Sequence, residues 1–129
     1  MNEKDAPILV VDDESDMCWI LEKIICKEGF ISMKALSGME AIAMTENNIF
    51  GLAFLDAKLT DIDGLELARQ LRNADASLPI VIVSGYYYQD DQYIKAALQS
   101  GLITAFVGKP FDHDDIVMVI ANYKLRQAG

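Results

Sequence analysis

Acidic, hydroxyl and basic residues follow short apolar runs along this chain. Asp12 and Asp13 end the first run, Asp56 ends the third, Ser84 ends the fourth, and Lys109 follows the fifth. If these runs are parallel strands of one sheet, their carboxyl ends meet at the same edge, where ligands bind in open α/β sheets. Three carboxylates so close would raise one another's pKa values unless a cation were present. A hard divalent ion such as Mg²⁺ accepts these oxygen ligands and keeps coordination positions for water and phosphate.

This set of groups predicts phosphoryl chemistry. A carboxylate beside a bound metal can act as a nucleophile toward a phosphoryl group and form an aspartyl-phosphate. The metal and a nearby lysine would neutralise the transferring oxygens, and a serine hydroxyl could donate a hydrogen bond to the product. Taken singly, an Asp at a strand end is most often a helix N-cap or a turn residue, and Asp13 before Glu14 and Ser15 could simply cap a helix. The joint occurrence at four of five strand ends favours a site.

Strand and helix patterns alternate throughout the sequence. Continuous apolar runs predict strands, helical spacing predicts helices, and alternation implies a parallel sheet covered by helices on both faces. The strands are expected at Pro7–Val11, Phe30–Leu36, Gly51–Leu55, Leu78–Val83 and Ile103–Val107. The helices are expected at Ser15–Lys27, Met39 to about Glu46, Gly64 to about Asn73, about Asp90 to Gln99, and from the N-cap Asp112 to about Arg126. We expect an α/β, doubly wound (βα)5 fold, one domain over residues 1–129 with its core at about 7–126.

Composition and charge argue against several classes of function. The net charge of −9, from 20 acidic and 11 basic side chains, argues against direct binding of nucleic acid or an anionic membrane. No apolar run approaches the roughly 20 residues that span a bilayer, and the polar N-terminus is no signal peptide. Cys18 and Cys26 lie eight residues apart, about 12 Å along one helix, so no disulfide can join them. We expect two buried free thiols and a cytoplasmic protein.

Four sequence motifs together resemble a known family. They are Ile8-Leu9-Val10-Val11-Asp12-Asp13-Glu14, Leu55-Asp56 leading to Asp63-Gly64, Val83-Ser84-Gly85-Tyr86, and Lys109-Pro110-Phe111. In their order and spacing they resemble the receiver domains of two-component response regulators, the CheY-like family, from residue 7 to about 125. The stretch Trp19–Lys23 is similar to receivers of the NtrC class of transcriptional activators. The resemblance implies a flavodoxin-like strand order, 2-1-3-4-5.

The resemblance also implies a role for each acidic residue. Asp56 would be the phosphoacceptor. Asp13 and Asp56 would ligate Mg²⁺, with the backbone carbonyl of Lys58 as a further ligand and Asp12 acting largely through water. The chain would then be no enzyme in the usual sense, since it would catalyse only its own phosphorylation and dephosphorylation.

Further positions match the switching machinery of the family. By resemblance, Lys109 pairs with the phosphoryl oxygens, Ser84 reorients toward them, and Phe106 takes the aromatic switch position whose rotamer reports the state of Ser84. The Lys109–Pro110 peptide bond is predicted to be cis. The phosphoryl group would favour a minor active arrangement and so change the surface of the fourth helix, fifth strand and fifth helix.

The resemblance implies partners as well. The phosphoryl donor would be a sensor histidine kinase or a histidine phosphotransfer protein, and the readout would go to an output domain or a protein target. A homodimer linked to phosphorylation is a further possibility, whereas direct contact with nucleic acid or membrane is not expected.

Several residues depart from the family pattern or allow more than one interpretation. Thr60 stands where many members have proline, so we expect a less rigid loop after Asp56. Lys58 places a second ammonium near the site, and we hypothesise that it changes the dephosphorylation rate. Trp19 and one or two members of the run Tyr86–Tyr88 are expected to be exposed, either as partner contacts or as local packing. His113 reads as a solvated residue at a helix start.

Three alternative functions fit these residues less well. A haloacid dehalogenase-type phosphohydrolase also uses strand-end acids, Mg²⁺ and lysine, but it places its nucleophile in an Asp-x-Asp pair after the first strand, whereas Asp12 and Asp13 are adjacent. A receiver-like module that is never phosphorylated would lack an acidic-pocket residue, and none is missing. A flavodoxin would need a phosphate-cradling loop where this chain is acidic.

Overall fold

The computed structural model describes residues 6–85 and 91–128. The strands are β1 (Ile8–Val11), β2 (Ser32–Ala35), β3 (Leu52–Asp56), β4 (Ile80–Ser84) and β5 (Ala105–Gly108). The helices are α1 (Ser15–Lys27), α2 (Gly38–Asn47), α3 (Gly64–Ala74), α4 (Gln92–Ser100) and α5 (His113–Ala128). Strands and helices alternate as the sequence predicts.

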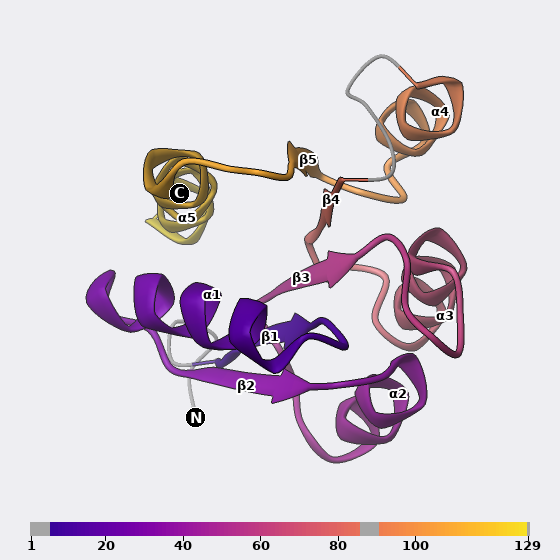
Figure 1. Ribbon diagram of the computed structural model, residues 1–129, viewed down its shortest axis with the longest axis horizontal. Coiled ribbons are helices and arrows are strands. Elements are labelled where there is room, and N and C mark those ends of the chain that lie inside the picture. The colour runs from indigo at the N-terminus through magenta and orange to yellow at the C-terminus, as the bar shows by residue number, and fades with distance from the viewer. Residues whose placement is uncertain (1–5, 86–90, 129) are drawn as a thin grey trace.

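All five strands form one parallel sheet in the order β2-β1-β3-β4-β5, which confirms the predicted topology. Helices α1 and α5 cover one face of the sheet, and α2, α3 and α4 cover the other (Figure 1). The strand order reverses between β1 and β3, since β1 connects outward to β2 on one side while β3 leads to β4 on the other. Ligand sites in such sheets lie at the carboxyl ends of the strands at this point.

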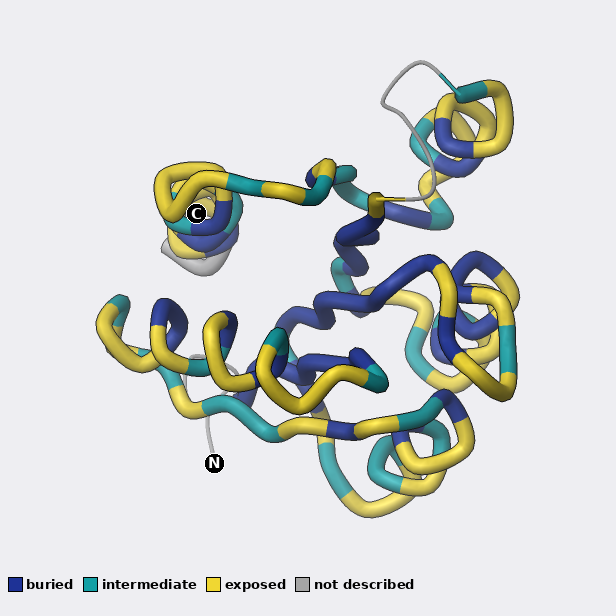
Figure 2. The backbone as a smooth tube through the Cα atoms, viewed as in Figure 1, coloured by how far each residue is buried: buried dark blue, intermediate teal, exposed yellow. Residues whose placement is uncertain are grey.

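The alternation of side chains along each strand builds two hydrophobic cores. Along β1, Ile8 and Val10 pack into the core under α1 and α5, whereas Leu9 and Val11 pack into the core under α2, α3 and α4. Every residue of the central strands β1, β3 and β4 is buried, and the edge strands β2 and β5 are only partly buried (Figure 2). The continuous apolar runs of the sequence therefore belong to strands covered on both faces.

Helix ends follow the predicted chemistry, with small shifts in position. Gly101 ends α4 at φ 80°, a left-handed conformation that glycine adopts without strain. At its start, α4 begins at Gln92 because the carboxylate of Asp91 accepts the backbone N–H of Tyr93 at 2.8 Å. The predicted start at Asp90 and the run Tyr86–Tyr88 lie outside the described residues. Within the described part of the chain, no helix combines the length and apolar character that crossing a bilayer requires.

One prediction about the cysteines is wrong. Both thiols are free, but only Cys18 is buried, and Cys26 is exposed. The other buried residues of α1, Leu21, Ile24 and Ile25, all lie to one side of Cys18 around the helix, and Cys26 lies about 80° to its other side, outside the buried face. Trp19 is 60% exposed, as predicted, with the ammonium of Lys23 4.6 Å from its ring centroid. His113 also has an exposed side chain at the start of α5.

Candidate functional site

The three predicted carboxylates meet at the carboxyl edge of the sheet. Val11 pairs with Leu55, so Asp12 and Asp56 follow at the same level on the neighbouring strands β1 and β3. One carboxylate oxygen from each of Asp12, Asp13 and Asp56 lies within 4.8 Å of the others. Asp12 and Asp56 are buried, and Asp13 is more exposed than either. Clustered carboxylate oxygens of this kind fit a hard divalent cation such as Mg²⁺.

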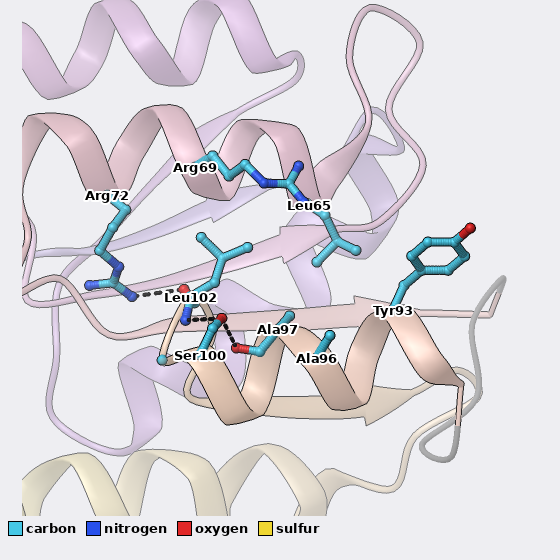
Figure 3. Close-up of a pocket in the computed structure, with 9 residues that line it drawn as sticks. Leu65, Arg69, Arg72, Tyr93, Ala96, Ala97, Ser100 and Leu102 are labelled. Carbon is cyan, nitrogen blue, oxygen red and sulfur yellow. Dashed lines mark hydrogen bonds between the residues drawn. The ribbon is translucent and has the colours of Figure 1, made fainter.

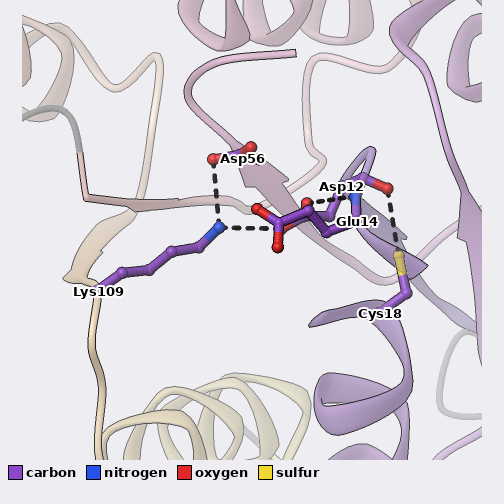
Figure 4. A network of polar contacts seen from close by, with 5 residues as sticks. All are labelled: Asp12, Glu14, Cys18, Asp56 and Lys109. Carbon is purple, nitrogen blue, oxygen red and sulfur yellow. Dashed lines mark hydrogen bonds and ion pairs between the residues drawn. The ribbon is translucent and has the colours of Figure 1, made fainter. Parts of the chain in front are cut away.

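Lys109 directly follows the edge strand β5, and its side chain extends toward Asp12 and Asp56 (Figure 4). Its Nζ donates to Asp12 Oδ2 at 3.0 Å and to Asp56 Oδ1 at 3.5 Å. The backbone N–H of Lys109 donates to the carbonyl of Ser84 at 2.8 Å, which fixes the segment after β5 to the end of β4. The Lys109–Pro110 bond is cis, as predicted. The lysine is therefore a member of the acidic site and not a solvated surface residue.

Local hydrogen bonds hold Asp12 in place. Its Oδ1 accepts the backbone N–H of Glu14 at 2.9 Å, and its backbone carbonyl accepts the thiol of Cys18 at 3.4 Å (Figure 4). Helix α1 has Glu14 at its N-cap position and no side-chain cap. Asp13 consequently does not serve as the helix cap that the sequence left open, and its carboxylate faces the cluster.

Burial and charge shift the ionisation of two groups. Burial raises the pKa of Asp56, and the charge of Asp12 adds to this, against the opposing effects of Lys109 and the backbone N–H of Lys58. Burial lowers the pKa of Lys109, but its hydrogen bond and charge interactions with Asp12 and Asp56 outweigh burial and raise it overall. The cluster thus contains three acidic groups against one ammonium. A divalent cation would offset this excess of acidic groups.

The two predicted switch residues lie on the strands beyond Asp56. Ser84 ends β4 and has a buried side chain. Strand β4 lies next to β3, where Asp56 pairs with Val83, the residue before Ser84. Phe106 lies on the edge strand β5, pairs with Ile82, and packs partly buried against the core under α2, α3 and α4. Ser84 thus faces the same sheet edge as the acids, and Phe106 sits two residues before the strand end.

The loop between β3 and α3 closes on itself beside Asp56. The backbone N–H of Gly64 donates to the carbonyl of Ala57 at 2.8 Å, and Lys58 forms an isolated bridge with Asp63. The carboxylate of Asp63 accepts the N–H of Leu65 at 2.9 Å and so caps α3. A side chain at Gly64 would lie 2.7 Å from the Cα of Ala57, so this close turn needs glycine. The loop carries the Lys58 carbonyl, the expected fourth metal ligand.

Asp61 has a role that no sequence motif indicates. Its carboxylate accepts hydrogen bonds from the backbone N–H groups of Gly38 and Met39, at the start of α2. These partners lie 23 and 22 positions away in sequence. No local motif signals such a contact.

A second concave region lies away from the acidic cluster. A groove of about 470 Å³ runs between α3 and α4, with Leu65 and Arg69 on one wall and Tyr93 and Ala96 on the other (Figure 3). At one end, the guanidinium of Arg72 donates to the carbonyl of Leu102 at 2.8 Å. None of the predicted site residues lines this groove.

Comparison with known proteins identifies the class. Residues 8–121 match the family model described as the response regulator receiver domain. The chain therefore belongs to this family, whose members are signalling modules of two-component systems that take phosphoryl groups from histidine kinases or phosphotransfer proteins. Within it, the chain is 31% identical over 123 residues to sporulation initiation phosphotransferase F of Bacillus subtilis, covering 95% of this chain and 94% of that protein.

Two further proteins are similar to the chain. It is 27% identical to the transcriptional regulatory protein ZraR of Klebsiella oxytoca, covering 94% of this chain but only 27% of that protein, which fits the resemblance to NtrC-class receivers. The chain thus spans about a quarter of the length of this regulator. The crystal structure of response regulator protein TrrA from Thermotoga maritima, in complex with Mg²⁺ and BeF, superposes with a TM-score of 0.78 at 26% identity, covering 92% of this chain and 98% of that one.

Proposed function

We propose that Asp56 is the phosphoacceptor of this receiver domain. Its carboxylate lies at the switch point of the sheet, beside Lys109 and within reach of two further acids. A carboxylate oxygen of Asp56 attacks the phosphorus of a phosphohistidine, the phosphorus–nitrogen bond breaks, and the electron pair leaves with the imidazole, which takes up a proton. The observation that carries the proposal is the convergence of Asp12, Asp13, Asp56 and Lys109 from three separate segments.

The same residues would hold Mg²⁺. Asp13 and Asp56 supply direct carboxylate ligands, the Lys58 carbonyl supplies another, and Asp12 acts largely through water. The bound ion supplies positive charge to the phosphoryl oxygens. The spacing of the three carboxylates supports this assignment, as does the presence of Mg²⁺ and BeF in the related TrrA complex.

Lys109, Ser84 and Phe106 carry the response. Lys109 pairs with the phosphoryl oxygens after transfer, the hydroxyl of Ser84 turns toward them, and the rotamer of Phe106 reports the state of Ser84. These movements change the surface formed by α4, β5 and α5. The position of Ser84 at the end of the strand next to Asp56, directly paired with Gly108 of β5, supports this coupling.

The phosphoryl donor is a sensor histidine kinase or a histidine phosphotransfer protein. The output is a further domain or a separate protein target, reached in some states through a phosphorylation-linked homodimer. The match covers only 27% of the length of ZraR, which supports the presence of an output domain in relatives of this kind. The exchange takes place in the cytoplasm, where the free thiols of Cys18 and Cys26 stay reduced.

Incubation with acetyl phosphate and Mg²⁺, followed by intact mass measurement, tests the proposal. The wild-type chain should gain the mass of one phosphoryl group, and Asp56→Asn should gain none. Asp75→Asn is the matched control because the carboxylate of Asp75 accepts its hydrogen bonds from the nearby Ser77 in the loop after α3, and the variant should be modified like the wild type. Chelation of Mg²⁺ should abolish the adduct. An adduct that persists in Asp56→Asn would overturn the assignment.

A further inference from the structure

The loop after β3 is held at its tip by the start of α2. Asp61 Oδ1 accepts the N–H of Gly38 at 3.0 Å, and Asp61 Oδ2 accepts the N–H of Met39 at 2.9 Å. The first N–H groups of a helix have no partner within the helix, and they carry a partial positive charge that favours a carboxylate. Ser37 satisfies the next group, since its hydroxyl accepts the N–H of Glu40 at 3.1 Å. The capping of α2 is thus shared between its own N-cap and a residue from another loop.

Apolar packing reinforces this contact. A side chain on Gly38 would collide with the Cγ2 atom of Ile62, the residue after Asp61, so glycine at this position lets the loop approach the helix. Ile62 in turn packs against the core under α2, α3 and α4. The two hydrogen bonds to Asp61 also hold the pKa of its carboxyl below the usual range, with the bond from Met39 contributing most. The carboxylate therefore remains ionised, and the contact intact, at neutral pH.

The base of the same loop lies beside the phosphoacceptor. The backbone N–H of Lys58 interacts with the carboxylate of Asp56, and the Lys58 carbonyl is the proposed metal ligand. Both groups move with the loop, which Gly64 and Ala57 close at its base and Asp61 anchors at its tip. Thr60 lacks the fixed backbone angle that proline would give the loop. The contact between Asp61 and α2 supplies order at that place by another means.

We propose that Asp61 is a positioning residue for the phosphoacceptor site. It touches neither substrate nor metal. By binding the first N–H groups of α2, it fixes the loop so that the Lys58 carbonyl faces the cation held by Asp13 and Asp56. The proposal rests on the proposed function, because it assigns Asp61 a role in the same metal site. Loss of residues that orient metal ligands through an outer contact typically lowers metal affinity ~10–100-fold.

Calorimetric titration with Mg²⁺ alone tests this role. Asp61→Ala should bind Mg²⁺ ~10-fold more weakly than the wild type, at the lower end of the range for outer contacts. Asp61→Asn keeps one acceptor oxygen and should fall between the two. Asp75→Ala is the control: it also removes a loop carboxylate that accepts two hydrogen bonds, but those come from Ser77, and Asp75 lies at the opposite end of α3 from the site. It should bind Mg²⁺ like the wild type.

Two more measurements separate positioning from a general loss of structure. Amide hydrogen exchange of the metal-free proteins should be faster in Asp61→Ala over residues 57–63 and at Gly38 and Met39, whose N–H groups lose their acceptor, and unchanged in the strands. The rate of phosphorylation by acetyl phosphate should recover to the wild-type value at saturating Mg²⁺, because only ligand placement is impaired. If Asp61→Ala does not fold, the Asp61→Asn comparison decides.

The outcomes are distinct from those of the proposed function. A wild-type chain that binds no Mg²⁺ and forms no adduct contradicts the proposed function itself. A functional wild type whose Asp61 variants match Asp75→Ala in Mg²⁺ affinity and exchange overturns the positioning role alone. Reduced affinity together with a reduced rate at saturating Mg²⁺ also overturns it, since that result places Asp61 in the transfer step.

Discussion

Lys109 donates a shorter hydrogen bond to Asp12 than to the phosphoacceptor candidate Asp56, at 3.0 Å against 3.5 Å. Asp12 is 2% exposed and accepts a second hydrogen bond from Glu14, so it offers a fixed, desolvated partner for the ammonium. The hydrogen bond to Asp12 thereby keeps the ammonium of Lys109 close to Asp56, while its contact with Asp56 is the weaker of the two. This arrangement holds a positive charge close to the carboxylate while leaving an oxygen of Asp56 accessible to a phosphoryl donor.

Replacing Lys109 with methionine should destabilise the metal-free protein and make it more responsive to Mg²⁺. Asp12 would be left buried without its cationic partner, which costs about 1–3 kcal/mol of unfolding free energy. Mg²⁺ should restore more stability to Lys109→Met than to the wild type, because the cation replaces the missing charge. Urea unfolding with and without Mg²⁺ measures both effects.

Lys124→Met provides the comparison for that experiment. Lys124 pairs with Glu28 at 3.6 Å on the surface, and such pairs contribute about 0–1 kcal/mol. Its loss should be small and insensitive to Mg²⁺. Equal behaviour of the two variants would contradict the account of Lys109.

Asp56→Asn should stabilise the protein at neutral pH without Mg²⁺. Burial raises the pKa of Asp56 in the native state, so ionised Asp56 favours unfolding. Between the ordinary carboxyl pKa of about 3.9 and the raised native value, the native state binds more protons than the unfolded state, and wild-type stability falls as pH rises through that window. We expect a gain in stability at pH 7 that vanishes below the window.

Thermal unfolding across pH checks this sign. The melting temperatures of wild type and Asp56→Asn should converge as pH falls, and added Mg²⁺ should reverse their order at pH 7, since the ion needs the carboxylate. A constant difference at all pH values would argue against a raised pKa at Asp56.

The two cysteines should react at very different rates. Burial, with a further effect from the charge of Asp12, raises the pKa of Cys18 to about 11, whereas Cys26 is exposed. Only a thiolate reacts with disulfide reagents, so Cys26 should be modified quickly in the native protein and Cys18 should not. A thiol titration should count one group natively and two in denaturant. Native Cys26→Ser should show almost no fast reaction, and rapid modification of that variant would contradict the burial of Cys18.

Gly64→Ala should lower stability by about 1–3 kcal/mol, the usual effect of forcing extra volume into a packed site. The added methyl group would meet the carbonyl of Asp56 and lie 2.7 Å from the Cα of Ala57, both parts of the backbone. Gly85→Ala is a suitable control, since its methyl group would lie 3.6 Å from Lys109 Cβ, an ordinary contact. Chemical denaturation of both variants gives the comparison, and similar stabilities would contradict the tight turn at Gly64.

The sequence predicted the fold well because its signals are local and repeated. Continuous apolar runs mark β1, β3 and β4, which are buried on both faces, and Gly29 and Gly101 mark helix ends with positive φ. The bounds of the edge strands were predicted less accurately. The fifth strand was expected at Ile103–Val107 and lies at Ala105–Gly108, because a half-exposed edge strand lacks a sharp apolar boundary.

The site was predictable as far as topology alone determines it. Parallel strands bring their carboxyl ends together, so the sequence alone was enough to place Asp12, Asp13 and Asp56 in one cluster. The hydrogen bonds from the start of α2 to Asp61 could not be predicted this way, since they depend on how the loop after β3 packs against that helix. The exposure of Cys26 was missed for a simpler reason, a rotation of about 80° that the eight-residue spacing already contained.

The acidic cluster also constrains when this chain becomes competent during its synthesis. Lys109 lies 97 positions after its partner Asp12, and the strands between them must all join the sheet before the two can meet. A nascent chain that has exposed its first three strands holds carboxylates without their ammonium. The complete cluster of three carboxylates and one ammonium therefore forms only after β5 has joined the sheet.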